Sequence, residues 1–316
     1  MKNLKVVFMG TPTFSVPILE SLIENTNVIL VVSQPDREKD RKGNLLPTEV
    51  KKIAQKNNIE VYQPINIKTE YQKIIDVNPD IIITCAYGQI KPETILNYPK
   101  YGCINVHGSL LPKLRGGAPI HHAIINGDNK TGITIMYMDK KMDSGDIISQ
   151  REMPINENDN LDYIYEKMSH LGSELLIDTL PSIIEGTNSR VKQDPNKVTF
   201  GPNITKEEEK IDFTKNSKSI HNLIRGLSSI PGAYCYLDGK RLKIYKSNLT
   251  DIKSKKEPGT IEMIDKTGIY ISTIDNLINI KDIKLEGKKR CEVKDFINGI
   301  KISEYIGKVL KWKKIL

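Results

Sequence analysis

Residues 4–33 read LKVVFMGTPTFSVPILESLIENTNVILVVS, two apolar runs with an amphipathic segment between them. Leu4 to Met9 and Val28 to Ser33 have the length and apolar character of buried strands. Gly10-Thr11-Pro12 ends the first run, and a helix is predicted from about Ser15 to Asn25. A strand, a helix and a second buried strand in this order are typical of a βαβ unit, which predicts a parallel sheet.

The same alternation continues through the first half of the chain. A helix is predicted to begin at about Thr48, and a long amphipathic helix from about Asn160 to Ile184 closes the pattern. We therefore predict a Rossmann-like α/β domain over residues 1–188. Its further strands are predicted at Ile59–Tyr62, Asp80–Ala86, Cys103–Val106 and Ile133–Met138.

The pattern changes after residue 188. Residues 189–205 are mainly polar and contain prolines, which predicts a linker. A helical segment from Ser217 to Leu227 follows, and then short strand candidates, with the hairpin signal Asp238-Gly239 between two of them. Several short strands predict a small β-barrel of the oligonucleotide-binding type over residues 206–316. The strand candidates are Ala233–Leu237, Arg241–Tyr245, Gly259–Ile264, Ile269–Ile274 and Ile278–Leu285.

The net charge of +8 is unevenly distributed along the chain. Residues 1–205 carry 23 Lys and Arg against 24 Asp and Glu, whereas residues 206–316 carry 24 against 15, a net charge of +9. One interpretation is an ordinary solvated, lysine-rich surface. The other, which we favour, is a surface that binds the phosphate backbone of a nucleic acid.

Length and composition suit a two-domain globular protein. The chain has 316 residues, of which 38% are hydrophobic and 27% charged. No apolar run approaches the roughly 18 residues that cross a bilayer, and the N-terminal residues lack the pattern of a signal peptide. The four cysteines are far apart in the sequence, which argues against a disulfide framework or a zinc site. We expect a cytoplasmic protein.

The densest group of chemically versatile side chains follows a predicted strand, in the segment Asn105-Val106-His107-Gly108-Ser109-Leu110-Leu111-Pro112. Open α/β sheets bind ligands at the carboxyl ends of their strands. Strand alternation places the side chains of Asn105 and His107 on the same side. Either residue alone is more often structural, but the two together, ahead of a loop with Gly and Pro, indicate a functional site.

A second polar segment contains three carboxylates within eight residues, Asp139, Asp143 and Asp146. The plain interpretation is an acidic turn, with Asp146 beginning the next strand. Three carboxylates so close together will not all be buried.

Taken together, these segments resemble the folate-dependent formyltransferase family over nearly the whole chain. Asn105, His107, the Ser-Leu-Leu-Pro run and Asp143 are typical of the whole family, whereas the segments after residue 200 resemble more narrowly the members that act on methionyl-tRNA. The matching segments are Gly10-Thr11-Pro12 with Phe14 and Pro17, Gln34 to Arg37, Ala86 to Gln89, Asn105 to Pro112, Asp143 to Asp146, His221 to Leu227, Pro231 to Ala233 and Gly239 to Ile244.

The resemblance implies a transferase in which Asn105, His107 and Asp143 are catalytic. An amine attacks the formyl carbon, negative charge builds on the formyl oxygen, and a proton leaves the nitrogen. Asn105 can donate a hydrogen bond to that oxygen, and His107 can stabilise it or move the proton. Asp143 would orient the imidazole, favour its charged form or accept the proton itself. Which of His107 and Asp143 is the base stays open, and no metal ligand set is expected.

The resemblance also implies a co-substrate, 10-formyltetrahydrofolate. Ser109, Leu110, Leu111 and Pro112 would contact it, since apolar side chains suit the flat faces of its rings and backbone groups can bind polar ring edges. The alternative is that Leu110 and Leu111 belong to the core of the domain.

The implied partner is initiator methionyl-tRNA, and the product would be N-formylmethionyl-tRNA for translation initiation. In the family, the charged loop that contains Arg41 and Lys42 approaches the acceptor stem. Lys42 stands where the family often has glycine, and Leu114 stands where tryptophan is common. A single chain that binds both substrates needs no partner subunit, so we expect a monomer without membrane contact.

Two other functions fit part of the pattern. A sugar-nucleotide formyltransferase or a formylfolate hydrolase domain would share Asn105, His107 and Asp143 but would have no evident use for a basic second domain. An RNA-binding protein whose transferase domain has decayed would have no reason to keep all three side chains.

Overall fold

The computed structural model describes residues 1–37 and 43–312. Their contacts divide the chain into two compact units. The first contains Met1–Pro119, Lys130–Pro154 and Tyr165–Pro202, and the second contains Ile120–Asn129, Ile155–Ile164 and Asn203–Leu316. Two short segments that precede residue 165 therefore pack with the C-terminal residues.

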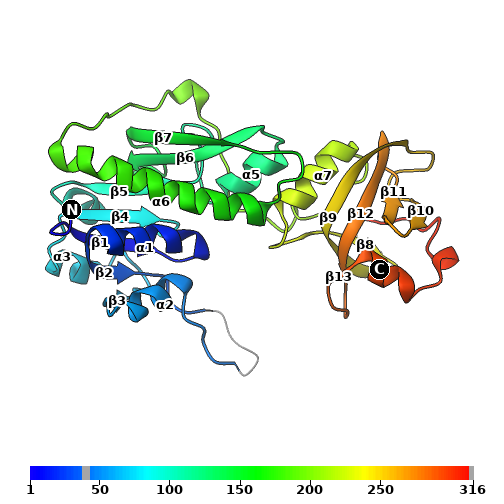
Figure 1. Cartoon of the computed structure of the whole chain (residues 1–316), viewed down its shortest axis with the longest axis horizontal. Helices are drawn as coiled ribbons and strands as arrows, with labels where there is room; N and C mark the ends of the chain where they lie inside the picture. Colours follow the sequence, from blue (N-terminus) through cyan, green and yellow to red (C-terminus); the bar gives the residue numbers. More distant parts are fainter. Residues whose placement is uncertain (38–42, 313–316) are drawn as a thin grey trace. The chain divides into compact units, whose positions relative to one another are not determined.

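A seven-stranded sheet forms the centre of the first unit, in the order β3-β2-β1-β4-β5-β6-β7 (Figure 1). The first five strands in this order are parallel, as predicted, but β6 runs antiparallel to both β5 and β7. A short connection joins β6 and β7, which only antiparallel neighbours permit. The strands are β1 (Lys5–Gly10), β2 (Asn27–Val32), β3 (Val61–Tyr62), β4 (Ile81–Cys85), β5 (Cys103–His107), β6 (Lys130–Tyr137) and β7 (Ile147–Pro154).

Helices pack against this sheet and seal its core. Gly172 of the long helix α6 lies against β5, where an added Cβ would be 3.1 Å from Val106 Cγ1. Ser173 of α6 donates a hydrogen bond to Ser21 of α1 (2.8 Å), so these helices are neighbours. The helices of this unit are α1 (Val16–Asn25), α2 (Glu49–Lys56), α3 (Gln72–Asp76), α4 (Glu93–Asn97) and most of α6 (Leu161–Glu185), with short 3-10 turns at Thr13–Ser15 and Pro195–Lys197. Helix α5 (Pro119–Ile125) belongs, apart from Pro119, to the second unit.

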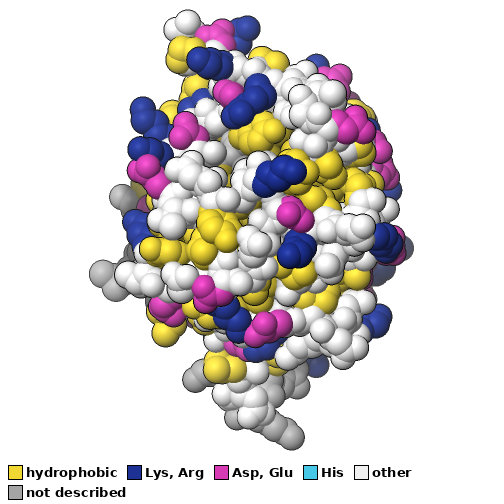
Figure 2. All heavy atoms as spheres, turned by 90° about the vertical axis from the view of Figure 1, so that its left-hand side faces the viewer, with side chains coloured by type: hydrophobic (Ala, Val, Ile, Leu, Met, Phe, Trp, Pro, Cys, Tyr) yellow, Lys and Arg dark blue, Asp and Glu magenta, His cyan; other side chains and the backbone are white. Residues whose placement is uncertain are grey.

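Figure 2 shows one face of the first unit, where Lys and Arg side chains alternate with Asp and Glu. This mixture agrees with the nearly balanced charge of residues 1–205. Within the described residues, none of the helices is both long enough and apolar enough to cross a membrane.

The second unit contains an antiparallel sheet in the order β10-β11-β12-β9-β8, with β13 paired to β12. The predicted α/β domain followed by a β domain is therefore confirmed. Strand β9 is much longer than predicted, because irregularities in its pairing with β12 let it bend and continue. The elements are α7 (Ser217–Gly226), β8 (Ala233–Leu237), β9 (Lys240–Lys253), β10 (Ile261–Asp265), β11 (Gly268–Ile271), β12 (Asn276–Leu285), β13 (Cys291–Glu292), α8 (Val293–Asn298) and a 3-10 turn at Ile302–Glu304.

Residues 308–311 close this sheet into a barrel. Tyr236 of β8 exchanges two backbone hydrogen bonds with Lys311, at 2.7 and 2.9 Å, and Leu310 N donates to Gly259 O, just before β10, at 2.8 Å. The segment therefore connects the two edge strands of the sheet. Its Leu310 side chain is 4% exposed and belongs to the barrel core.

The segment 155–164 is fixed within the second unit by α7. Arg225 Nη1 donates to the carbonyls of Asn156 and Asp159, at 2.9 and 2.8 Å. His221 Nε2 donates to Glu157 O at 3.0 Å, and burial lowers the pKa of His221, so the ring is neutral at pH 7. The polar side chains of α7 thus satisfy backbone carbonyls of the same unit.

We predict that Leu310→Ala lowers the free energy of unfolding of the second unit by about 2–4 kcal/mol, because it leaves a cavity in the barrel core. The chain has one tryptophan, Trp312, so denaturant unfolding followed by tryptophan fluorescence reports on this unit. Val309→Ala is the matched control: Val309 is 40% exposed, and its truncation should change stability by less than about 1 kcal/mol. Equal effects of the two changes would contradict barrel closure by this segment.

Candidate active site

Asn105 lies on β5, beside the end of β4. Thr84 Oγ1 of β4 donates a 2.7 Å hydrogen bond to Asn105 Oδ1, which fixes the orientation of the amide. Within residues 1–37 and 43–312, Asn105 Nδ2 donates to no protein group. The amide therefore presents an available N–H donor at this edge of the sheet.

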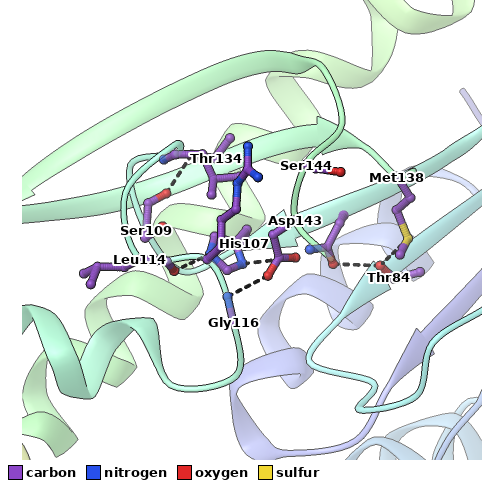
Figure 3. A network of polar contacts seen from close by, with 12 residues as sticks. Thr84, His107, Ser109, Leu114, Gly116, Thr134, Met138, Asp143 and Ser144 are labelled. Carbon is purple, nitrogen blue, oxygen red and sulfur yellow. Dashed lines mark hydrogen bonds and ion pairs between the residues drawn. The ribbon is translucent and has the colours of Figure 1, made fainter. Parts of the chain in front are cut away.

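His107 ends β5, two residues after Asn105, and is 5% exposed. Its Nε2 lies 3.1 Å from Leu114 O. Because a carbonyl oxygen only accepts hydrogen bonds, Nε2 carries a proton, and in the neutral ring Nδ1 has the free lone pair. Nδ1 lies 3.7 Å from Asp143 Oδ1, and Figure 3 shows the two side chains directed toward each other. A proton taken up at Nδ1 would form an ion pair with this carboxylate.

Asp143 is held in a tight turn between β6 and β7. Its backbone has φ +51°, in the left-handed region, which is costly for a residue with a side chain. The second carboxylate oxygen, Oδ2, accepts a 2.8 Å hydrogen bond from Gly116 N (Figure 3). The structure thus brings Asp143, predicted from the sequence as a distant carboxylate, against His107.

The predicted folate segment forms a buried turn. Ser109 Oγ donates to Lys113 O at 2.6 Å, and Thr134 Oγ1 bonds both Ser109 O (2.6 Å, Figure 3) and Leu111 N (3.1 Å). Ser109 is 1% exposed and Leu111 is 3% exposed, whereas Leu110 and Pro112 are partly exposed. Only the latter two offer side-chain surface to a ligand in this conformation.

Several groups that position the site could not be recognised from the sequence. Leu114 supplies the carbonyl that fixes His107. The Leu114 backbone is itself held in place, because its N–H donates to Thr199 Oγ1 at 2.9 Å. Gln193, within the predicted linker, donates to the carbonyl oxygens of Asp143 and Gly145. Backbone carbonyls leave no signature in a sequence, and a glutamine in a polar stretch does not stand out.

Lys91 lies in the loop after β4, with its ammonium 5.1 Å from the centre of the Tyr87 ring. Burial lowers the pKa of Lys91 from 10.5 to about 8, although Cys103, Asp143 and Cys85 oppose this shift. Burial also raises the pKa of the Cys85 and Cys103 thiols to about 12, so both are neutral at pH 7.

Arg41 and Lys42, predicted to contact tRNA, lie outside the described residues. In the part of the chain that the structure describes, no three His, Cys, Asp or Glu side chains gather into a group that could hold a metal ion.

The arrangement combines an amide N–H donor with an imidazole–carboxylate pair at one sheet edge. The donor can stabilise negative charge on an oxygen, and the pair can take up a proton. These are the requirements of acyl transfer to an amine. The chain belongs to the formyl transferase family: the family profile for formyl transferase matches residues 3–180, and the one for the formyl transferase C-terminal domain matches residues 203–301.

Among its relatives are proteins named methionyl-tRNA formyltransferase. The one from Staphylococcus aureus (strain MW2) is 48% identical over 309 residues, which cover 97% of this chain and 99% of the relative. Another, from strain bovine RF122 / ET3-1, is 49% identical over 298 residues, 93% of this chain and 96% of the relative. The predicted family resemblance is confirmed.

Solved structures share the fold at lower identity. The N-formyltransferase from Helicobacter canadensis, in complex with folinic acid and dTDP-3-aminofucose, has a TM-score of 0.64 and 24% identity, over 89% of this chain and 98% of that one. HypX from Aquifex aeolicus, in complex with tetrahydrofolic acid, has a TM-score of 0.64 and 16% identity, over 94% of this chain and 47% of that one.

We predict that Lys91→Met raises the free energy of unfolding at pH 7 by roughly 1–3 kcal/mol, because it removes a cation whose folded-state pKa is depressed. That cost is complete below pH 8, where Lys91 is charged in both states, and it disappears as the pH rises through 10.5, where both states are neutral. The stability gain should follow the same course in denaturant titrations.

Lys100→Met is the matched control for this stability prediction. Lys100 also lies over an aromatic ring, 4.8 Å from the centre of Tyr101, but is exposed, so its replacement should change stability by less than about 0.5 kcal/mol. A stability gain at Lys91 that does not vary between pH 7 and pH 10.5 would contradict the assignment of the cost to charge.

Proposed function

We propose that this chain transfers the formyl group of 10-formyltetrahydrofolate to the amino group of methionyl-initiator tRNA, giving N-formylmethionyl-tRNA for translation initiation. The observation that carries the proposal is 48% identity, over nearly the full length of both chains, with a relative named for this reaction. The contact between His107 and Asp143 supplies the chemistry that the transfer needs.

The reaction begins with attack of the neutral amine on the formyl carbon. A bond forms between nitrogen and carbon, and the C=O electrons move onto the formyl oxygen. Asn105 donates its available N–H to that oxygen, a contribution typically worth roughly 10²–10³ in rate. When the oxygen electrons return, the bond from the carbon to the folate nitrogen breaks, and the leaving nitrogen takes a proton that balances the one lost by the attacking nitrogen.

His107 and Asp143 move the proton that the attacking nitrogen loses. The hydrogen bond to Leu114 O keeps the His107 proton on Nε2, so the ring can accept a second proton at Nδ1, where Asp143 lies 3.7 Å away. The proton reaches the pair directly or through water, and the carboxylate stabilises the imidazolium that results. The pair acts as one unit, so the proton need not be assigned to either residue alone.

The folate-binding segment remains Ser109 to Pro112. The partly exposed side chains of Leu110 and Pro112 suit the flat faces of the folate rings. Ser109 and Leu111 act by holding the turn through Thr134 and Lys113.

The tRNA partner is assigned to the basic C-terminal domain, residues 206–316, and to the loop with Arg41 and Lys42. We assign catalysis to residues 1–188 and the connection between the domains to residues 189–205. Of these residues, 189–202 pack within the first unit, whereas 120–129 and 155–164 pack within the second. We expect a cytoplasmic monomer, because translation initiation occurs in the cytoplasm and one chain supplies both His107 and Asp143.

Purified protein incubated with 10-formyltetrahydrofolate and methionyl-tRNA should yield N-formylmethionyl-tRNA. His107→Ala should lower kcat by about 10²–10⁴ while tRNA binding stays nearly unchanged, since His107 is buried away from the surface. Lost tRNA binding in a folded His107→Ala protein would mean that the site is misassigned. Turnover of a sugar amine but not of methionyl-tRNA would place the chain among sugar formyltransferases instead.

Replacing Lys240, Lys246 and Lys284 by Gln should weaken tRNA binding and flatten its salt dependence. All three are exposed on β9 and β12, and each phosphate contact contributes about 0.7–0.9 to the slope of log K against log salt. The control removes the same charge from the first unit, at the exposed residues Lys52, Lys56 and Lys68. An equal change in tRNA binding in both variants would mean that only the net charge of the protein matters, and would contradict a specific tRNA-binding surface on β9 and β12.

A further inference from the structure

We infer that Gln193 is a positioning residue of the active site: its side-chain amide joins the two loops that meet at Asp143 and so sets the geometry of the His107–Asp143 pair. The inference rests on the proposed function for the role of that pair. Gln193 lies within the predicted linker, where nothing in the sequence marks it as functional.

The Gln193 amide uses its full hydrogen-bonding capacity. Nε2 donates to Asp143 O at 2.8 Å and to Gly145 O at 2.9 Å. Oε1 accepts from Arg115 Nε at 3.0 Å and from Arg115 Nη2 at 2.7 Å. A primary amide has two donors and two acceptor positions, so all four are engaged. In the opposite orientation, the amide oxygen would face two carbonyl oxygens and the NH₂ group would face a guanidinium, so none of the four hydrogen bonds could form.

These bonds close a ring around the catalytic carboxylate. Gln193 binds the Arg115 side chain. Gly116, which follows Arg115, donates its N–H to Asp143 Oδ2 at 2.8 Å. The backbone carbonyl of Asp143 in turn accepts a hydrogen bond from Gln193. Backbone bonds between Arg115 and the residues Thr199 and Gly201, at 2.9 and 2.7 Å, anchor the segment that follows Gln193. The carboxylate is therefore fixed through both its backbone and its side chain.

The turn at Asp143 needs such a restraint. Its left-handed backbone, φ +51°, costs about 1 kcal/mol or more. Gly145 packs so closely that an added Cβ would lie 2.0 Å from Tyr137 O. The gap between His107 Nδ1 and Asp143 Oδ1 is 3.7 Å, so a shift of about 1 Å would either form a hydrogen bond or break the contact, and displacements of this size can cost about 10²-fold in rate.

The two ends of the amide can be tested separately because Gln and Glu have the same shape. Gln193→Glu keeps an acceptor for Arg115 but faces a carboxylate oxygen toward the carbonyls of Asp143 and Gly145. Gln193→Met removes both sets of bonds at similar volume. Gln55→Glu, at an exposed position of α2, makes the same chemical change away from the site.

Steady-state kinetics of formyl transfer should show kcat lowered about 10-fold to 10²-fold in Gln193→Glu and Gln193→Met. KM for both substrates should stay within about threefold, and the pH profile of kcat should shift. Gln55→Glu should behave like the unchanged protein. Raised KM values with unchanged kcat would overturn the inference, as would unchanged kinetics in all variants.

A second measurement does not depend on turnover. In protein labelled with ¹⁵N-histidine, the pH titration of the His107 ring nitrogens should move in both Gln193 variants, and the titration of His221, in the other unit, should not. An unmoved His107 titration in folded variants would overturn the inference. If the unchanged protein fails to formylate methionyl-tRNA, the proposed function fails, whereas the His107 titration still decides the role of Gln193.

Discussion

The geometry of the proposed active site depends on the two interactions of one carboxylate. Asp143 receives the Gly116 N–H on one oxygen and faces His107 Nδ1 with the other. Both side chains are largely shielded from water, so a charge on the imidazole would interact with the carboxylate more strongly than it would at the surface. If the carboxylate moved, the imidazole would lose its acidic neighbour, and the loops on either side would lose their common anchor.

This arrangement explains why strained backbone is found at the site. Leu114 and Asp143 both have left-handed backbones, with φ +57° and +51°, yet each provides a contact to His107. Leu114 supplies the carbonyl that keeps the proton on Nε2, and Asp143 supplies the carboxylate at Nδ1. Such conformations persist where surrounding bonds over-determine them. Here those bonds come from Thr199 and Gln193, in a segment without helix or strand at those positions.

The sequence predicts the features whose signal is local. The strand that carries Asn105 and His107 can be recognised because its apolar residues alternate with these two polar ones over five positions. The parallel part of the sheet can be predicted because strands alternate with helices along the chain. The antiparallel direction of β6, closure of the barrel by residues 308–311, and the clamp at Gln193 could not be predicted. Each depends on pairing between residues far apart in the chain, such as Tyr236 with Lys311. The identity of one residue does not predict which distant residue it pairs with.

In the second unit, a segment that resembles enzymes acting on tRNA need not itself contact the tRNA. The segment His221 to Leu227 contributes to the narrower resemblance to enzymes that act on methionyl-tRNA, yet His221, Asn222 and Arg225 are at most 6% exposed. Arg225 and His221 bind backbone carbonyls of residues 156–159. A guanidinium committed to two carbonyls and to Asn222 Oδ1 is poorly placed to neutralise a phosphate as well. This segment therefore stabilises the fold of the second unit. An RNA backbone would instead have to bind exposed cations such as those of β9 and β12.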